Sequence, residues 1–199
     1  MLCIPSVNSG GFFLLYAKLP KNKSDIHKEM KKNLIAVIAF LFAANGIFAK
    51  NINFQIVQNN PGTEEVFVTS YLFEQAMVDF FFESGHIVSN SPAIIYSDES
   101  GDKDELKKAL VETTIGSMDV LVRVFVNYDQ VNAKNPKVFL LELVKSVSWK
   151  SYSGSTGKLI SEGSLLPGTI DSTNNNESGI YNFASLVASK ISAGLKNAK

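Results

Sequence analysis

Hydrophobic positions alternate with polar ones in some segments of the chain and recur every three to four residues in others. Alternation predicts half-buried strands, and the longer spacing predicts amphipathic helices. We therefore expect strands over residues 52–58, 86–88, 120–128, 137–152 and 158–166, and helices from 63–69 to 84, over 102–114 and over 180–195. This order, β-α-β-α-β-β-β-α, predicts an α/β (α+β) sandwich, in which helices pack on a mixed sheet of about five strands.

Glycines mark the expected ends of several elements. Gly85 and Gly116 follow the first two predicted helices and are expected to end them. The sequence Gly154-Ser155-Thr156-Gly157 predicts a hairpin turn between the last two strands. Residues 89–101 predict a loop that contains a short apolar piece.

An unbroken apolar run of 11 residues, Leu34–Ala44, has a different character. Lys31-Lys32 precede it, and Asn45-Gly46 and a small residue, Ala49, follow. This is the layout of a secretory signal peptide that begins at Met30. A membrane-spanning helix needs about 20 apolar residues, so the short run favours cleavage near Ala49. Retention of the run as a membrane anchor is the alternative.

The signal peptide defines three segments. We expect residues 1–29 to be an over-extended N-terminus, residues 30–49 the signal peptide, and residues 50–199 a single α/β domain. A genuine two-part leader is the alternative for residues 1–29. The predicted location is periplasmic or secreted, and the chain would meet the membrane only transiently, through the signal peptide.

Excision of residues 1–49 changes the composition of the working chain. Residues 50–199 carry 13 basic and 17 acidic residues, a net charge of −4, and Arg123 is the only arginine. An acidic domain without a clustered basic face is a poor nucleic-acid binder. The domain also contains no Cys, because Cys3 lies in the first segment, which excludes disulfides and thiolate chemistry.

Candidate catalytic and metal-binding groups are few. His86 is the only histidine after residue 49, so zinc sites of the usual kind are excluded. Acidic residues gather around Gly101, where an acidic helix start is favoured over a calcium site: Asp98, Glu99, Asp102, Asp104 and Glu105. The Gly157-Lys158 pair lacks the flanking pattern of a phosphate-binding loop. We expect no catalytic residue, no cofactor and no metal.

The first predicted helix carries two apolar stripes. Phe73, Ala76, Met77 and Phe80 form the first stripe, and Tyr71, Val78 and Phe82 form the second. A helix on one face of a sheet needs one stripe. The second stripe either packs on the C-terminal helix or is an exposed patch of the kind that marks a partner surface. Tyr71, Val78 and Phe82 are therefore our candidate protein interface.

Several segments resemble a known group of proteins. They are residues 80–88, 116–122, 138–144 and 154–159. In their order they are similar to periplasmic α/β domains related to the TolB amino-terminal domain, the curli secretion lipoprotein and the lipoprotein activators of penicillin-binding proteins. The resemblance spans most of Asn53 to Leu195, although Arg123 follows Val122 where the group usually has a glycine. It implies a non-catalytic scaffold or regulator of the cell envelope.

Together these features predict an exported, non-catalytic interaction domain, periplasmic or envelope-associated. Its partner would be another envelope protein or a second copy of the chain, with no nucleic acid. The alternative is a small-ligand-binding or hydrolytic periplasmic protein with a pocket near His86 and the segment Ser89–Ser100.

Overall fold

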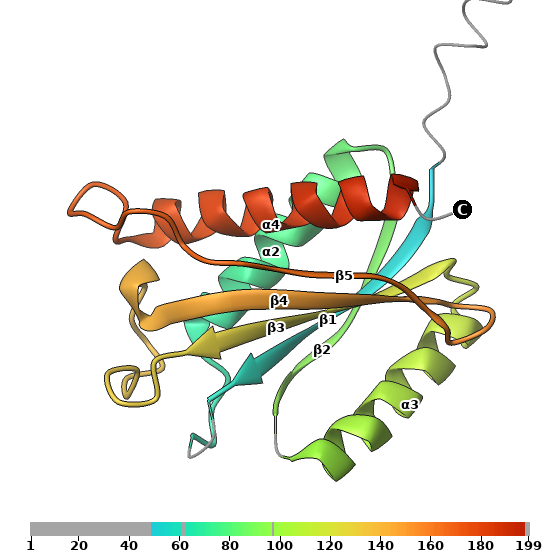
Figure 1. The fold of residues 1–199 in the computed structure, drawn as a ribbon, viewed down its shortest axis with the longest axis horizontal. Coiled ribbons are helices and arrows are strands. Elements are labelled where there is room, and N and C mark those ends of the chain that lie inside the picture. Colours follow the sequence, from blue (N-terminus) through green and yellow to red (C-terminus); the bar gives the residue numbers. More distant parts are fainter. Residues whose placement is uncertain (1–48, 61–62, 97, 198–199) are drawn as a thin grey trace, which may run out of the picture. The chain divides into compact units, whose positions relative to one another are not determined.

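The computed structural model describes residues 49–60, 63–96 and 98–197. The predictions for residues 1–29 and for nearly all of 30–49 lie outside this part of the chain. The described elements follow the predicted order (Figure 1): β1 (Asn51–Asn59), α2 (Val68–Glu83), β2 (Ile87–Ile95), α3 (Glu99–Ile115), β3 (Val120–Tyr128), the 3-10 helix η1 (Leu141–Leu143), β4 (Val144–Ser153), β5 (Leu159–Leu165) and α4 (Glu177–Asn197). The predicted α/β class is confirmed.

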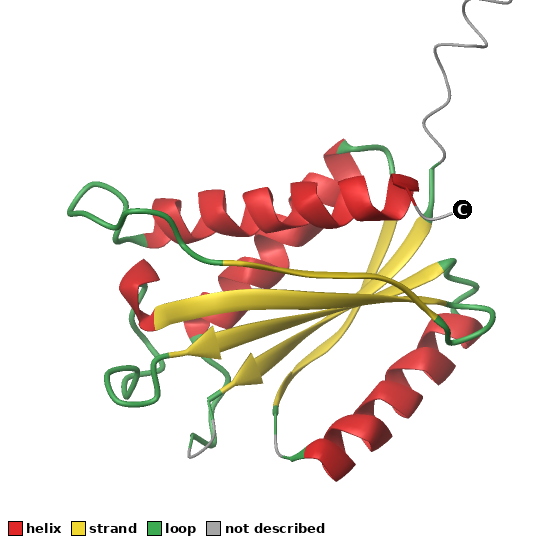
Figure 2. Ribbon diagram, in the orientation of Figure 1, coloured by secondary structure: helices red, strands yellow, loops and turns green. Residues whose placement is uncertain are grey.

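The sheet is mixed and has the strand order β2-β1-β3-β4-β5. β1 pairs in parallel with β2 and β3, whereas β3, β4 and β5 form an antiparallel meander. Helices α2 and α4 lie on one face of the sheet and α3 lies on the other, so the fold has three layers (Figure 2). No helix within the described residues is long and apolar enough to cross a membrane.

The hydrophobic core lies between the sheet and the α2–α4 layer. Alternation along the two central strands points one set of side chains to this side: Ile52, Phe54, Ile56, Val120, Val122, Val124 and Val126. The stripe predicted for α4 faces them and is fully buried: Ile180, Phe183, Ala184, Val187, Ile191 and Leu195. Burial of each large apolar side chain contributes roughly 1.5–3 kcal/mol, so this layer is the main source of stability.

Helix α2 begins and ends by different devices. Its N-cap residue, Phe67, supplies no side-chain cap. Instead Gln58 of β1 accepts a hydrogen bond from the Phe67 amide through Oε1 at 2.7 Å and another from the Ser70 hydroxyl at 3.0 Å. At the other end Gly85 adopts φ +81°, as predicted for a left-handed helix stop.

Strand β2 is longer than predicted. The sequence predicted a strand over 86–88 and then a loop, but the strand continues to Ile95. Pro92 has no backbone N–H to donate to a neighbouring strand, and the register of β2 with β1 shifts between Gln55 and Val57. β2 is an edge strand, which tolerates a proline and an irregular register better than a central strand does.

Strand β4 is shorter than predicted. The alternating pattern over 137–152 suggested one long strand, but its first half is a loop that leads into η1, and β4 begins only at Val144. Val144 pairs with Tyr128, the last residue of β3, so residues before Val144 have no strand to pair with. Leu141 and Leu143 are buried at the rim of the core, whereas Phe139 is 37% exposed.

The β4–β5 hairpin forms as predicted, with residues 154–156 in the turn. Trp149 of β4 is buried and its ring lies over Gly163 of β5. A side chain at Gly163 would collide with this ring, so glycine is required there for the tryptophan to pack.

Candidate functional site

The outer face of α2 carries the candidate interface. Phe73, Ala76 and Met77 of the first stripe are completely buried, and the Phe73 ring meets Phe183 of α4 edge-on at 6.0 Å between centroids. The second stripe is different: Tyr71 is 54% exposed and Phe82 is 72% exposed.

Polar contacts on both flanks of α2 fix the direction of the second stripe. On one side Asn90 of β2 donates a hydrogen bond to Glu74. On the other side the Tyr181 hydroxyl of α4 donates to Asp79 at 2.8 Å. Tyr71 and Phe82 therefore point away from the sheet and do not pack into the contact with α4. Val78 is half-buried against the core.

A groove of about 380 Å³ lies between α2 and the start of α4. It is lined by Leu72, Gln75, Glu177, Ser178 and Tyr181. Since Gln75 follows Tyr71 by one turn, the groove borders the exposed stripe. α2 itself contains three acidic residues and no basic one.

The acidic surroundings are visible in the side-chain pKa of Tyr181. The hydrogen bond to Asp79 raises the pKa of Tyr181, and burial and the neighbouring charges of Asp79 and Glu83 raise it further. Burial raises the pKa of Glu74, and its hydrogen bond from Asn90 acts in the opposite direction. The surface therefore combines exposed aromatic rings with a negative rim.

His86 occupies a structural position. It is buried, its Nδ1 accepts a hydrogen bond from the Lys50 amide at 3.1 Å, and its ring meets Phe81 edge-on. Burial lowers the pKa of His86, and the positive charge of Lys196 adds to that effect. A neutral His86 that links the end of α2 to the start of β1 explains these contacts.

The segment expected to complete a pocket with His86 does not form a loop. Residues 89–95 belong to β2, and α3 begins at Glu99. Ser91 faces the sheet interior, where it donates to Glu112 at 2.6 Å and accepts from Asn53 at 3.2 Å. The described part of the chain therefore does not bring His86 together with the polar side chains of this segment.

The acidic residues around Gly101 each have a structural partner. Asp98 caps α3 by accepting a hydrogen bond from the Gly101 amide at 2.7 Å. The others form ion pairs: Glu99 with Lys103, Asp104 with Lys107, Glu105 with Lys108, and Asp102 with Arg123. Among the described residues no group of three or more His, Cys, Asp or Glu side chains lies close enough to hold a metal ion.

Arg123 has a role that the sequence did not indicate. The alternation of β3 correctly placed it on the face opposite the apolar core, but it is completely buried there, under α3. Nε donates to Gln55 at 3.0 Å, Nη2 lies 2.9 Å from Asp102, and the guanidinium carbon lies 5.2 Å from the centroid of the Phe125 ring. The only sequence signal was its position as a lone arginine within an apolar strand.

A family model matches residues 51–196, and its description reads "Uncharacterised protein". The chain belongs to this family. The match covers the whole described sheet, α2, α3 and all but the last residue of α4. No curated protein matches the chain.

Solved structures with a similar fold come from several bacteria. A dodecamer of PelC from Paraburkholderia phytofirmans is 13% identical, with a TM-score of 0.40, covering 74% of this chain and 89% of that one. The lipoprotein GNA1162 from Neisseria meningitidis is 12% identical, with a TM-score of 0.38 and coverage of 72% and 99%. Protein XCC0632 from Xanthomonas campestris is 10% identical, with a TM-score of 0.35 and coverage of 72% and 82%.

The similarity is too distant to transfer a function to this chain. The PelC structure is a dodecamer and GNA1162 is a lipoprotein, and both are properties of those proteins. The narrower resemblance to TolB and the penicillin-binding-protein activators stays a prediction.

Proposed function

We propose that this family member is an exported, non-catalytic interaction domain of the periplasm or cell envelope, and that Tyr71, Val78 and Phe82 form its protein interface. The observation that carries the proposal is the exposure of Tyr71 and Phe82 on one face of α2. Aromatic side chains are enriched in the energetically important centres of protein interfaces. Water contact at two such rings is unfavourable in the free domain and is relieved by a partner.

The partner in this proposal is another envelope protein or a second copy of the chain. The export signal predicted over residues 30–49 supports a location outside the cytoplasm. The negative rim of Glu74, Asp79 and Glu83 favours a partner surface that is apolar at its centre and basic at its edge. The alternative, a ligand-binding or hydrolytic pocket at His86, has less support because His86 is buried with its Nδ1 hydrogen-bonded.

Site-specific photo-crosslinking in living cells tests this function. A photoreactive phenylalanine analogue replaces Tyr71 or Phe82, and Leu166 serves as the matched control because it is 69% exposed, close to the value for Phe82. We expect one discrete crosslinked product from positions 71 and 82 and none from 166. Mass spectrometry of the product distinguishes a second copy from another protein.

A second variant connects the crosslink to the proposed contact. Phe82→Ser should weaken the crosslink formed from position 71 by about tenfold or more, because truncation of a hot-spot side chain at the centre of an interface costs about 2 kcal/mol or more. The free energy of unfolding should change by less than about 0.5 kcal/mol, since Phe82 is exposed. Equal products from all three positions, or none from 71 and 82, would contradict the proposed interface.

A further inference from the structure

A second group of exposed apolar side chains lies on the α3 side of the sheet. Ile87 is 62% exposed, Val111 57%, Ile115 78% and Leu159 50%. We call these four residues the basal patch. They come from the start of β2, the last turns of α3 and the start of β5, and they are separate from the α2 stripe on the opposite face.

Backbone hydrogen bonds bring these segments to the first residues of β1. The Ile87 amide donates a hydrogen bond to the Lys50 carbonyl oxygen at 3.1 Å. The Asp119 amide, which follows α3, donates to the Asn51 carbonyl oxygen at 2.8 Å. The Gly154 amide at the β4–β5 hairpin donates to the Asp119 carbonyl oxygen, also at 2.8 Å. The segments that carry the basal patch therefore meet at the end of the sheet where β1 begins.

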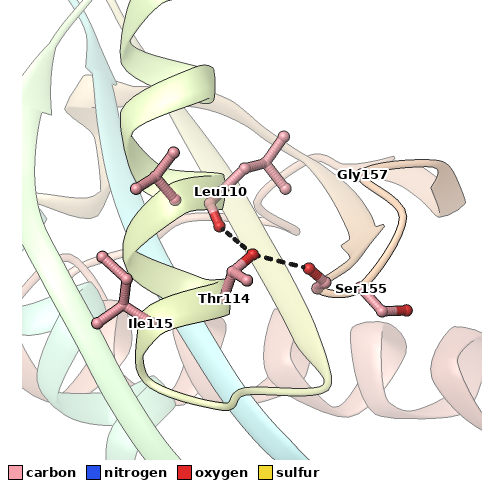
Figure 3. A pocket seen from close by; sticks show the side chains of 7 residues that line it. Leu110, Thr114, Ile115, Ser155 and Gly157 are labelled. Atoms are coloured by element: carbon pink, nitrogen blue, oxygen red, sulfur yellow. Dashed lines mark hydrogen bonds between the residues drawn. The ribbon is translucent and has the colours of Figure 1, made fainter.

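The part of the patch formed by Val111 and Ile115 borders a groove. A groove of about 260 Å³ runs between the last turns of α3 and the β4–β5 hairpin, with Leu110, Val111 and Ile115 along its helical wall (Figure 3). The Thr114 hydroxyl lies 2.9 Å from the Leu110 carbonyl oxygen and 3.1 Å from that of Gly154. Because its proton is used within the protein, this wall presents mainly hydrocarbon to the solvent.

The sequence before β1 indicates what covers the patch. Six residues, 45–50, separate the apolar run Leu34–Ala44 from the start of β1 at Asn51. The seven steps from Ala44 to Asn51 span at most about 25 Å. Whenever this run is in a membrane, as an export signal before cleavage or as a retained anchor, the end of the domain that carries the basal patch is held close to the bilayer.

We infer that the basal patch docks on a lipid bilayer, with Ile87, Val111, Ile115 and Leu159 at the boundary between headgroups and acyl chains. Membrane-surface binding grows with the apolar area that is buried and with attraction between basic residues and anionic lipids. Lys158 is exposed beside Leu159, but the acids Glu112 and Asp119 are exposed in the same part of the domain, so the apolar side chains and not a basic cluster carry the lipid contact. This lipid contact is a function beyond the protein interface proposed for α2.

The test uses the full chain reconstituted into vesicles of phosphatidylethanolamine and phosphatidylglycerol. Cys3→Ser provides a cysteine-free background, since Cys3 is the only cysteine. A polarity-sensitive fluorophore is then attached to single variants Ile115→Cys or Leu159→Cys. Val131→Cys and Leu166→Cys are matched controls: these residues are 74% and 69% exposed and follow the C-terminal ends of β3 and β5, at the other end of the sheet.

We expect blue-shifted emission and quenching by a lipid-borne quencher at positions 115 and 159, and water-like emission at 131 and 166. In a chain labelled at Ile87→Cys, the pair Ile115→Ser and Leu159→Ser should lower the ratio of docked to free domain by about tenfold, whereas Val131→Ser with Leu166→Ser should not change it. Water-like emission at all four positions, or equal quenching at both ends, would overturn the inference. The fluorescence results are independent of the crosslinks from Tyr71 and Phe82, so each proposal can fail without the other.

Discussion

At the scale of single residues, the Arg123–Asp102 pair is an ion pair whose energy depends on both partners. Arg123 is fully buried, and the Asp102 side chain is 23% exposed at the start of α3. Desolvation of a guanidinium is costly, and the ion pair and the hydrogen bond to Gln55 offset only part of that cost, because Arg123 Nη1 and Nη2 are buried without a hydrogen-bond partner. The pair therefore fixes the position of α3 on the sheet more than it adds net stability.

Removal of Asp102 alone should show that the buried Arg123 depends on its counter-ion. Asp102→Ala is expected to lower the free energy of unfolding by about 3 kcal/mol, because it leaves a buried charge without its counter-ion. The double variant Asp102→Ala with Arg123→Met should recover most of that loss, since no buried charge remains. Urea denaturation of both variants measures the difference.

Glu99→Ala is the matched control. It removes an ion pair from the same helix, but the Glu99 side chain is 83% exposed. Exposed pairs contribute about 0–1 kcal/mol, so the change should be small. A double variant as unstable as Asp102→Ala alone would show that the cost comes from packing rather than from the unpaired charge.

At the scale of elements, the start of α2 depends on another strand. Gln58 is completely buried at the end of β1, and its side chain holds the Phe67 amide, the Ser70 hydroxyl and, through Nε2, the Glu65 carbonyl oxygen at 3.0 Å. Side-chain caps usually come from the residue that precedes the helix. Here the cap comes from nine residues before Phe67, which couples the helix start to the strand.

Gln58→Leu tests this coupling. The change replaces the polar amide with an apolar side chain of similar size and leaves the Phe67 amide without its acceptor. We expect a loss of about 2 kcal/mol in the free energy of unfolding, the usual cost of an unsatisfied buried group, measured by thermal or urea denaturation. Gln75→Leu, on the exposed face of α2, should change stability by less than about 0.5 kcal/mol. Equal effects from both substitutions would argue against the cap.

At the scale of the whole molecule, the N-terminus links location to structure. If export cleaves the chain after Ala49, Lys50 becomes the first residue, and its backbone nitrogen already lies 3.1 Å from His86 Nδ1. A new ammonium group there would turn this contact into a charge-assisted hydrogen bond, which is stronger than the neutral one. The start of the domain is therefore well suited to being a chain end.

Mass spectrometry of the chain isolated from the producing cells checks this prediction. We expect an N-terminus at Lys50, or at Ile47 if the enzyme cuts after Gly46. A peptide that contains Phe12 to Lys18 would contradict the over-extended start, and an intact Leu34–Ala44 run in the isolated protein would favour the retained anchor.

Part of the candidate site could be predicted from sequence and part could not. The two stripes of α2 follow from helical spacing alone, and the structure exposes Tyr71 and Phe82 of the second stripe. The length of β2 and the loop before β4 could not be predicted, because both depend on which strand lies alongside. The basal patch was also missed, since its members are far apart in the sequence and meet only through pairing with β1.

The sequence by itself determined the order of the elements and the buried stripe of α4, because hydrophobic spacing is a local property that each segment carries independently. Only the tertiary structure decided that Arg123 is buried. Its counter-ion, Asp102, lies on α3 and reaches Arg123 only when that helix packs on the sheet. The tertiary structure alone also decided that the strand predicted from residue 137 begins at Val144, because a strand forms only where a neighbour supplies backbone partners.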